Sequence, residues 1–103
     1  MLNQLLLDQF YQFSSIPFPP NSDDKVISDV HDQLVEYDGY MAGLISSYAK
    51  GNQTVKSKIC YDDQFEKSIA QRVVESPHLE KEAQVYFEYL QKLKELIDLA
   101  QQS

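Results

Sequence analysis

The chain has 103 residues, which is enough for one domain with its own hydrophobic core and without a disulfide or a structural metal. Its 16 acidic and 9 basic residues give a net charge of −7, so we expect no nucleic-acid partner, because phosphates are bound by cations. No apolar run approaches the ~18 residues of a membrane span, and the first residues lack the basic start of a signal peptide. We therefore expect no membrane association and a cytoplasmic location, which the single Cys60 also fits.

Residues 2–13 predict a short amphipathic helix. Its apolar face consists of Leu2, Leu5, Leu6, Phe10 and Phe13. A helix of about 12 residues is marginal in water, so this one must dock on other helices. We expect it to dock on its own bundle, and exchange with a neighbouring subunit is the alternative.

Residues 14–21 (SSIPFPPN) predict a proline-rich strap that joins this helix to the next one. Residues that precede proline are pushed towards extended conformations, and three prolines in four positions hold the chain extended. We expect Ile16 and Phe18 to hold the strap on the bundle surface.

Residues 22–50 predict a long helix, with Asn21 or Ser22 as its N-cap and Gly51 as its stop. One face carries apolar residues at alternating spacings of three and four, namely Ile27, Val30, Leu34, Tyr37, Met41, Leu44 and Tyr48. Gly39 and Gly43 lie on the opposite face, and each costs about 1 kcal/mol relative to alanine. Either they are tolerated weak points of a continuous helix, or they form a smooth patch where another backbone approaches.

Residues 52–75 allow two interpretations. In one, Thr54 begins a helix on whose apolar face Asp62 and Glu66 would be buried at a high cost. In the other, which we prefer, Asp62 caps a shorter helix over 63–75 that packs through Phe65, Ile69 and Val73. Residues 52–61 would then form a structured loop or an irregular helical turn.

Ser76 and Pro77 mark the start of a last helix over 77–101. Its apolar face again alternates spacings of four and three, through Leu79, Ala83, Tyr86, Leu90, Leu93, Ile97 and Ala100. A second stripe of Val85, Tyr89 and Leu96 widens the apolar arc to about 200°. We expect so wide an arc to contact two neighbours, its own bundle and a second copy of the chain.

Two sets of residues are candidates for chemistry. Arg72 and His78 have five residues between them, a spacing that one family of helical nucleases uses, but Pro77 divides the pair between two helices. His31 is expected to be half-buried and His78 exposed. The second set is carboxylates on two helices that could bind Mg²⁺ and act on a nucleotide, namely Asp62, Asp63, Glu66, Glu95 and Asp98. Solvated helix charges explain these carboxylates better, so we expect no metal and no cofactor.

The sequence therefore predicts an all-α, up-and-down helical bundle that forms a single domain over residues 1–103. It consists of two long heptad-patterned helices, one shorter helix and a short N-terminal helix. Because no catalytic set is complete, we predict a small interaction protein (an adaptor, inhibitor or regulatory subunit) that forms a homodimer and binds a protein partner of unknown identity. The predicted interface residues are Gly39, Tyr40, Gly43, Val85, Tyr89 and Leu96. The alternatives are a Mg²⁺-dependent nucleotide hydrolase and an acidic mimic of nucleic acid.

Overall fold

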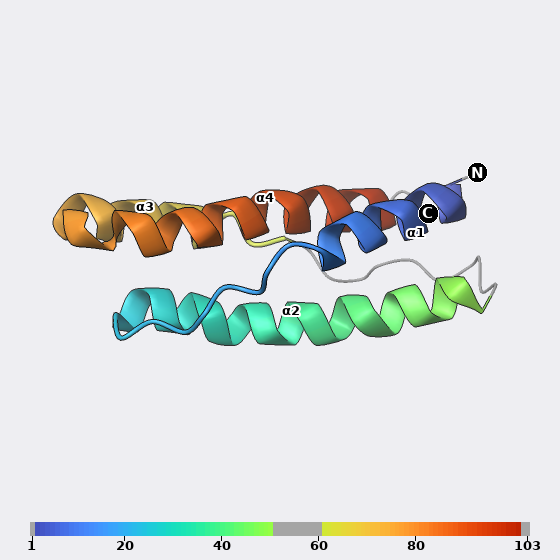
Figure 1. The fold of residues 1–103 in the computed structure, drawn as a ribbon, viewed down its shortest axis with the longest axis horizontal. Helices are drawn as coiled ribbons and strands as arrows, with labels where there is room; N and C mark the ends of the chain where they lie inside the picture. Colours follow the sequence, from blue (N-terminus) through green and yellow to red (C-terminus); the bar gives the residue numbers. More distant parts are fainter. Residues whose placement is uncertain (1, 51–60, 102–103) are drawn as a thin grey trace.

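A computed structural model describes residues 2–50 and 61–101. These residues form α1 (Leu2–Ser14), α2 (Lys25–Ala49), α3 (Gln64–Glu75), the short 3₁₀ turn η1 (Pro77–Leu79) and α4 (Glu80–Gln101). Successive α-helices run in opposite directions along a particle 46 Å long (Figure 1). The predicted all-α helical bundle is confirmed, and the described residues contain no strand.

The two long helices run in the same direction, and the two shorter helices lie beside them (Figure 1). Both α1 and α3 contact α2 and α4, so each shorter helix joins the long ones. α1 packs near the C-terminal end of α4, whereas α3 forms an antiparallel pair with the first half of α4 (Figure 1). One continuous core of buried side chains runs through all four α-helices.

α2 is one unbroken helix across Asp38 and Gly39, as predicted. Six members of its predicted apolar face are buried in the core, namely Ile27, Val30, Leu34, Tyr37, Met41 and Leu44. The helix starts later than predicted because Asp24 is its cap: the backbone N–H of Ile27 donates to Asp24 Oδ2 at 3.2 Å. Ser22 instead accepts the backbone N–H of Asp24 at 3.1 Å. The prediction of Asn21 or Ser22 as the cap was therefore wrong.

α1 docks on its own bundle. Phe13 is buried, and Leu7 and Phe10 pack against the core. Leu5 is 48% exposed, so it lies off the docked face on which we predicted it.

The strap that follows α1 is held by both long helices. The hydroxyl of Tyr86 donates to the carbonyl of Pro20 at 2.6 Å, and Pro19 is fully buried. The ring of Phe18 lies edge-on to His31 and Tyr89, with centroid distances of 5.4 and 5.2 Å. Ile16 also packs on the core, so both residues predicted to hold the strap contact the bundle.

α3 follows the shorter of the two predicted registers, but it begins at Gln64, and Asp63 rather than the predicted Asp62 takes the N-cap position. Asp62 is exposed, and its Oδ1 accepts the backbone N–H of Gln64 at 2.9 Å. Phe65 and Ile69 are buried, while Val73 packs partly against the core. The prediction for residues 52–61 falls almost wholly outside the described residues. After Ser76 the chain makes the 3₁₀ turn η1, so α4 itself begins at Glu80 rather than at Pro77.

The second stripe of α4 belongs largely to the core of the single chain. Tyr89 and Leu96 are each only 2% exposed, whereas Val85 is 37% exposed. Tyr89 is covered by the ring of Phe13, 4.9 Å away between centroids, and by Phe18. The wide apolar arc of α4 is therefore accounted for by α1 and the strap, without a second copy of the chain. This corrects the prediction that Tyr89 and Leu96 face a partner.

Candidate functional site

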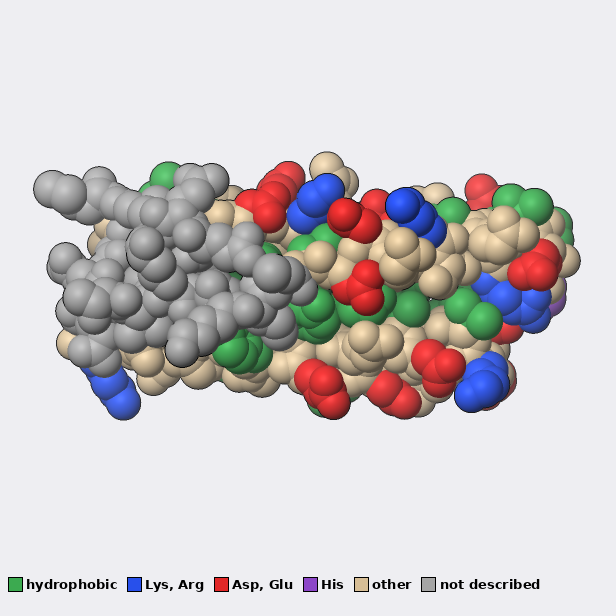
Figure 2. All heavy atoms as spheres, turned by 180° about the vertical axis from the view of Figure 1, so that it is seen from behind, with side chains coloured by type: hydrophobic (Ala, Val, Ile, Leu, Met, Phe, Trp, Pro, Cys, Tyr) green, Lys and Arg blue, Asp and Glu red, His purple; other side chains and the backbone are tan. Residues whose placement is uncertain are grey.

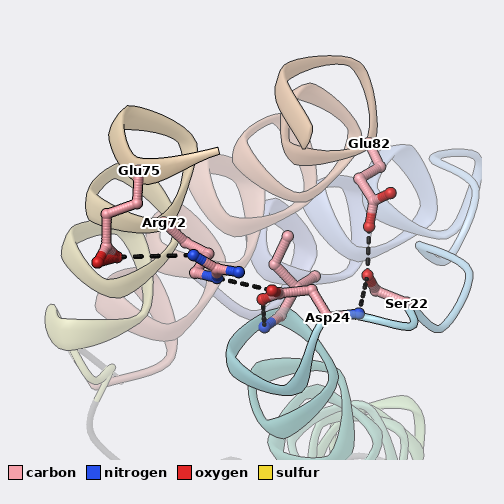
Figure 3. A network of polar contacts seen from close by, with 6 residues as sticks. Ser22, Asp24, Arg72, Glu75 and Glu82 are labelled. Carbon is pink, nitrogen blue, oxygen red and sulfur yellow. Dashed lines mark hydrogen bonds and ion pairs between the residues drawn. The ribbon is translucent and has the colours of Figure 1, made fainter. Parts of the chain in front are cut away.

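The first candidate site is a polar network between the N-terminus of α2, the end of α3 and the start of α4. Arg72 Nε donates to Asp24 Oδ1 at 2.6 Å, and its Nη1 lies 3.8 Å from Glu75 Oε1. Ser22 donates from its hydroxyl to Glu82 Oε1. Figure 3 shows Arg72 between Glu75 and Asp24, with the Ser22–Glu82 pair on the other side of Asp24.

Asp24 lies at the centre of this network, because its two oxygens bind Arg72 and the backbone of Ile27. Its side chain is 9% exposed. Burial by itself raises the pKa of Asp24, but hydrogen bonds from Arg72 and from the backbone of Ile27, with the positive charge of Arg72, lower that pKa below its ordinary value. Asp24 is therefore held as a carboxylate that caps α2 and binds Arg72 at the same time.

This network does not form the predicted pair of Arg72 and His78. Among the described residues, the hydrogen bonds and ion pairs of Arg72 go to Asp24, Glu75 and the backbone of Ser76, and none goes to His78. His78 is exposed, as predicted, and lines a hollow of about 370 Å³ with Ser22, Asp23, Asp24, Leu79 and Glu82. The hollow is acidic, and Arg72, the cation of the network, is bound to Asp24.

The predicted carboxylate set on α3 and α4 is divided among separate contacts. Asp63 Oδ1 lies 3.8 Å from Lys94 Nζ, and Glu95 Oε2 lies 3.4 Å from Lys92 Nζ. Glu66 accepts a hydrogen bond from the hydroxyl of Tyr61 at 2.8 Å, and burial together with this carboxylate raises the pKa of Tyr61. Within residues 2–50 and 61–101, no three His, Cys, Asp or Glu side chains are grouped so that they could hold a metal ion.

Glu95 and Asp98 lie instead beside α1. Together with Leu5, Gln9 and Leu99 they line a hollow of about 380 Å³ between α1 and α4. The back of the molecule, seen in Figure 2, carries acidic and basic side chains interspersed on either side of a line of hydrophobic ones. Such mixed charges are typical of solvated helix faces.

His31 is half-buried, as predicted, under the ring of Phe18. Its Nδ1 is buried without a hydrogen-bond partner, since the nearest carboxylate oxygen, Asp32 Oδ1, is 3.7 Å away. The neighbouring Tyr89 hydroxyl lies 3.5 Å from Asp38 Oδ1, and burial with this carboxylate raises the pKa of Tyr89. The ring of Phe18 in the strap lies against both His31 and Tyr89.

The second candidate site is the exposed side of the second half of α2. At Gly39 and Gly43, no atom of the described residues outside the adjacent backbone of α2 lies within 4 Å of the position where a Cβ would stand. With Tyr40, Leu44 and Ser47 they line a hollow of about 330 Å³, most of whose lining is apolar. Residues 39–49 carry no charged side chain, although the chain as a whole has a net charge of −7. We call the residues Gly39, Tyr40, Gly43, Leu44 and Ser47 the glycine groove.

Three of the six predicted interface residues thus lie together in the glycine groove, namely Gly39, Tyr40 and Gly43. Val85 is partly exposed on another helix, and Tyr89 and Leu96 are buried. The sequence interpretation missed Ser47 as a member. Its signal was present, because Ser47 follows Gly43 by four residues and so continues the same side of the helix.

No family model, no curated protein and no solved structure matches this chain. Within the described part of the chain, none of the helices has both the length and the apolar character needed to cross a membrane. The fold therefore defines a helical bundle, and function has to be argued from the sites themselves.

Proposed function

We propose that this protein is a small cytoplasmic interaction protein, an adaptor, inhibitor or regulatory subunit, that binds a partner through the glycine groove of α2. The observation that carries the proposal is the combination of Gly39 and Gly43 with open space at both Cβ positions in an uncharged stretch of helix. Small residues at a spacing of four let a second backbone approach a helix closely.

The cost of the two glycines supports a role outside the chain's own fold. Each glycine inside a helix is less favourable than alanine by about 1 kcal/mol. Among the described residues, no atom outside the adjacent backbone of α2 lies within 4 Å of an alanine methyl group built at either position. Packing within the described part of the chain therefore gives no reason for glycine, whereas a partner backbone lying against the groove would need the methyl groups to be absent.

The nucleotide hydrolase and the nucleic-acid mimic are less well supported. The carboxylates proposed for the hydrolase bind Lys94, Lys92 and Tyr61 rather than converging on one point. The mimic would need a concentrated acidic face, and the face seen in Figure 2 mixes both signs of charge.

Site-specific photo-crosslinking in cells that make the chain tests the proposal. A benzophenone amino acid placed at Tyr40 should give one discrete crosslinked product, because Tyr40 lines the groove and this change replaces one aromatic side chain by another while both glycines stay open to the partner. The matched control places the same amino acid at Gln91, an exposed position of α4. Absence of a discrete product at Tyr40, or the same product from Gln91, would contradict the proposal.

A further inference from the structure

The glycine groove lies beside a regular pattern of charge on α2. Asp32 precedes Gly39 by seven residues, and Lys50 follows Gly43 by seven. At about 100° per residue, Asp32 and Lys50 point in the same direction, with the two glycines about 20° to either side of that line. Lys50 still follows the helix, since its backbone N–H donates to the carbonyl of Ser46 at 3.2 Å, and all four residues are exposed.

We infer that the partner at the glycine groove is a second copy of this chain, with the two α2 helices antiparallel and crossing level with Met41. This inference rests on the proposed function and names the occupant of the same site. Met41 is nine residues from Asp32 and nine from Lys50. An antiparallel pair centred there places Asp32 of each copy level with Lys50 of the other, and Gly39 level with Gly43.

Charge complementarity favours this arrangement over the other ways of pairing two copies. Two chains that each carry a net charge of −7 repel one another over most of their surfaces. On this face the uncharged residues meet in the centre and one opposite-charge pair lies at each end. Glu36, about 40° from the line through Asp32 and Lys50, lies level with the uncharged Ser46 of the other copy. A parallel pair would instead place Asp32 against Asp32 and Lys50 against Lys50.

The dimensions of the face indicate a weak and reversible dimer. The distance from Asp32 to Lys50 along the helix is about 27 Å at 1.5 Å per residue. Contact between one helix of each copy is smaller than the interfaces of permanent dimers. The missing side chains at the two glycines let the helix axes come to about 8 Å, the lower end of the usual range. At that separation a lysine side chain reaches a level aspartate even at a crossing angle of about 20°.

Sedimentation velocity on the full chain at low ionic strength, over a range of concentrations, tests the inference. We expect the wild-type chain to self-associate, and Asp32→Lys or Lys50→Asp to weaken the association about tenfold, because each change turns two attractive pairs into two repulsive ones. The double variant Asp32→Lys/Lys50→Asp should restore the wild-type affinity to within about twofold. Only the antiparallel arrangement predicts this rescue.

Two further variants serve as controls. Glu88→Lys makes the same change of net charge as Asp32→Lys on an exposed position of α4, so it should not weaken the association. Gly43→Arg should abolish the association while the circular dichroism spectrum of the folded bundle is retained, since arginine is a better helix former than glycine.

The outcomes separate this inference from the proposed function. A wild-type chain that stays monomeric, or single variants that associate as well as wild type, would overturn the antiparallel dimer. If the crosslinker at Tyr40 then captures a protein of different mass, the groove still binds a partner and only its identity was wrong. A crosslinked product of twice the mass of the chain supports both.

Discussion

Arg72 Nε lies 2.6 Å from Asp24 Oδ1, and this contact joins the first turn of α2 to the last turn of α3 across 48 residues of sequence. The carboxylate of Asp24 also accepts the backbone N–H of Ile27 through its other oxygen. The side chain of Asp24 therefore caps the N-terminus of α2 and also anchors α3. Figure 3 shows that Arg72 can reach Asp24 because the end of α3 lies against the start of α2.

Replacing Arg72 should destabilise the fold. Arg72→Ala leaves the largely buried Asp24 carboxylate without its ion pair, and we expect a loss of about 1.5–3 kcal/mol in the free energy of unfolding. Urea denaturation followed by circular dichroism measures it. The matched control is Lys25→Ala, which removes the exposed pair with Asp29 (3.7 Å) and should cost less than about 0.5 kcal/mol. Equal losses in the two variants would show that the Asp24–Arg72 contact is worth no more than an exposed pair.

The same contact predicts how stability depends on acid. The pKa of Asp24 is lowered in the folded chain relative to its ordinary value of 3.8, so the folded state binds fewer protons than the unfolded state in this range. The stabilisation is present above pH 3.8 and should be lost as the pH falls below it through the folded pKa. Thermal melts between pH 7 and pH 2 measure this loss. In Arg72→Ala the loss should be smaller, and an unchanged acid profile would argue against Asp24 as its source.

The raised pKa of Tyr86 predicts that the chain loses stability at alkaline pH. Burial, together with the negative charges of Glu82 and Asp32, raises its pKa from 10.0 to about 12. Between these values the unfolded chain loses the phenolic proton more readily than the folded chain, so stability should fall as the pH rises from 10 towards 12. Unfolding free energies at pH 9 and pH 11 test this.

Tyr86→Phe separates that titration from the other tyrosines. The variant lacks the hydrogen bond to the carbonyl of Pro20, so it should be less stable than wild type near pH 7 by about 1 kcal/mol. Its stability should also decline less steeply above pH 10. A decline as steep as that of wild type would assign the alkaline effect to Tyr61 and Tyr89, whose pKa values are also raised by burial.

The glycines of α2 make a prediction about the isolated chain. Gly39→Ala and Gly43→Ala should each raise the unfolding free energy by about 1 kcal/mol, because among the described residues the added methyl group meets no atom within 4 Å outside the adjacent backbone of α2. The matched reverse change is Ala42→Gly, on the same exposed side, which should lower stability by a similar amount. These measurements need a protein concentration at which the chain is monomeric. A destabilising effect of either alanine would mean that the fold itself uses the glycine.

Leu96 and Val85 test the correction made to the second stripe of α4. Leu96 is 2% exposed, so Leu96→Ala should cost about 2–5 kcal/mol by leaving a cavity in the core. Val85 is 37% exposed, so Val85→Ala should cost less than about 1 kcal/mol. Chemical denaturation of the two variants side by side measures the difference. Similar small losses would return Leu96 to the surface where the sequence interpretation placed it.

Local patterns were sufficient to predict the helices and most of the core. The alternating apolar spacing of α2 predicted the six buried residues from Ile27 to Leu44, because helical periodicity fixes which side chains share a face. The shorter register of α3 was correctly preferred, since the longer one would have buried two carboxylates, although Asp63 rather than Asp62 takes the N-cap position. The exposed position of Gly39 and Gly43 also followed from periodicity alone.

Only the tertiary structure decided which neighbours cover each face. In the sequence, Tyr89 and Leu96 appear as surplus apolar surface, whereas in the fold both are buried and Phe13 of α1 lies against Tyr89. A local pattern does not predict where a short docked helix will lie. The cap of α2 is Asp24 rather than the predicted Asn21 or Ser22, and its carboxylate also binds Arg72, which lies 48 residues further along the chain. The sequence by itself therefore determined the helices and their apolar sides, through periods of a few residues. Which segments cover those sides depended on contacts between residues far apart in the sequence. These contacts leave the glycine groove of α2 as an uncharged hollow.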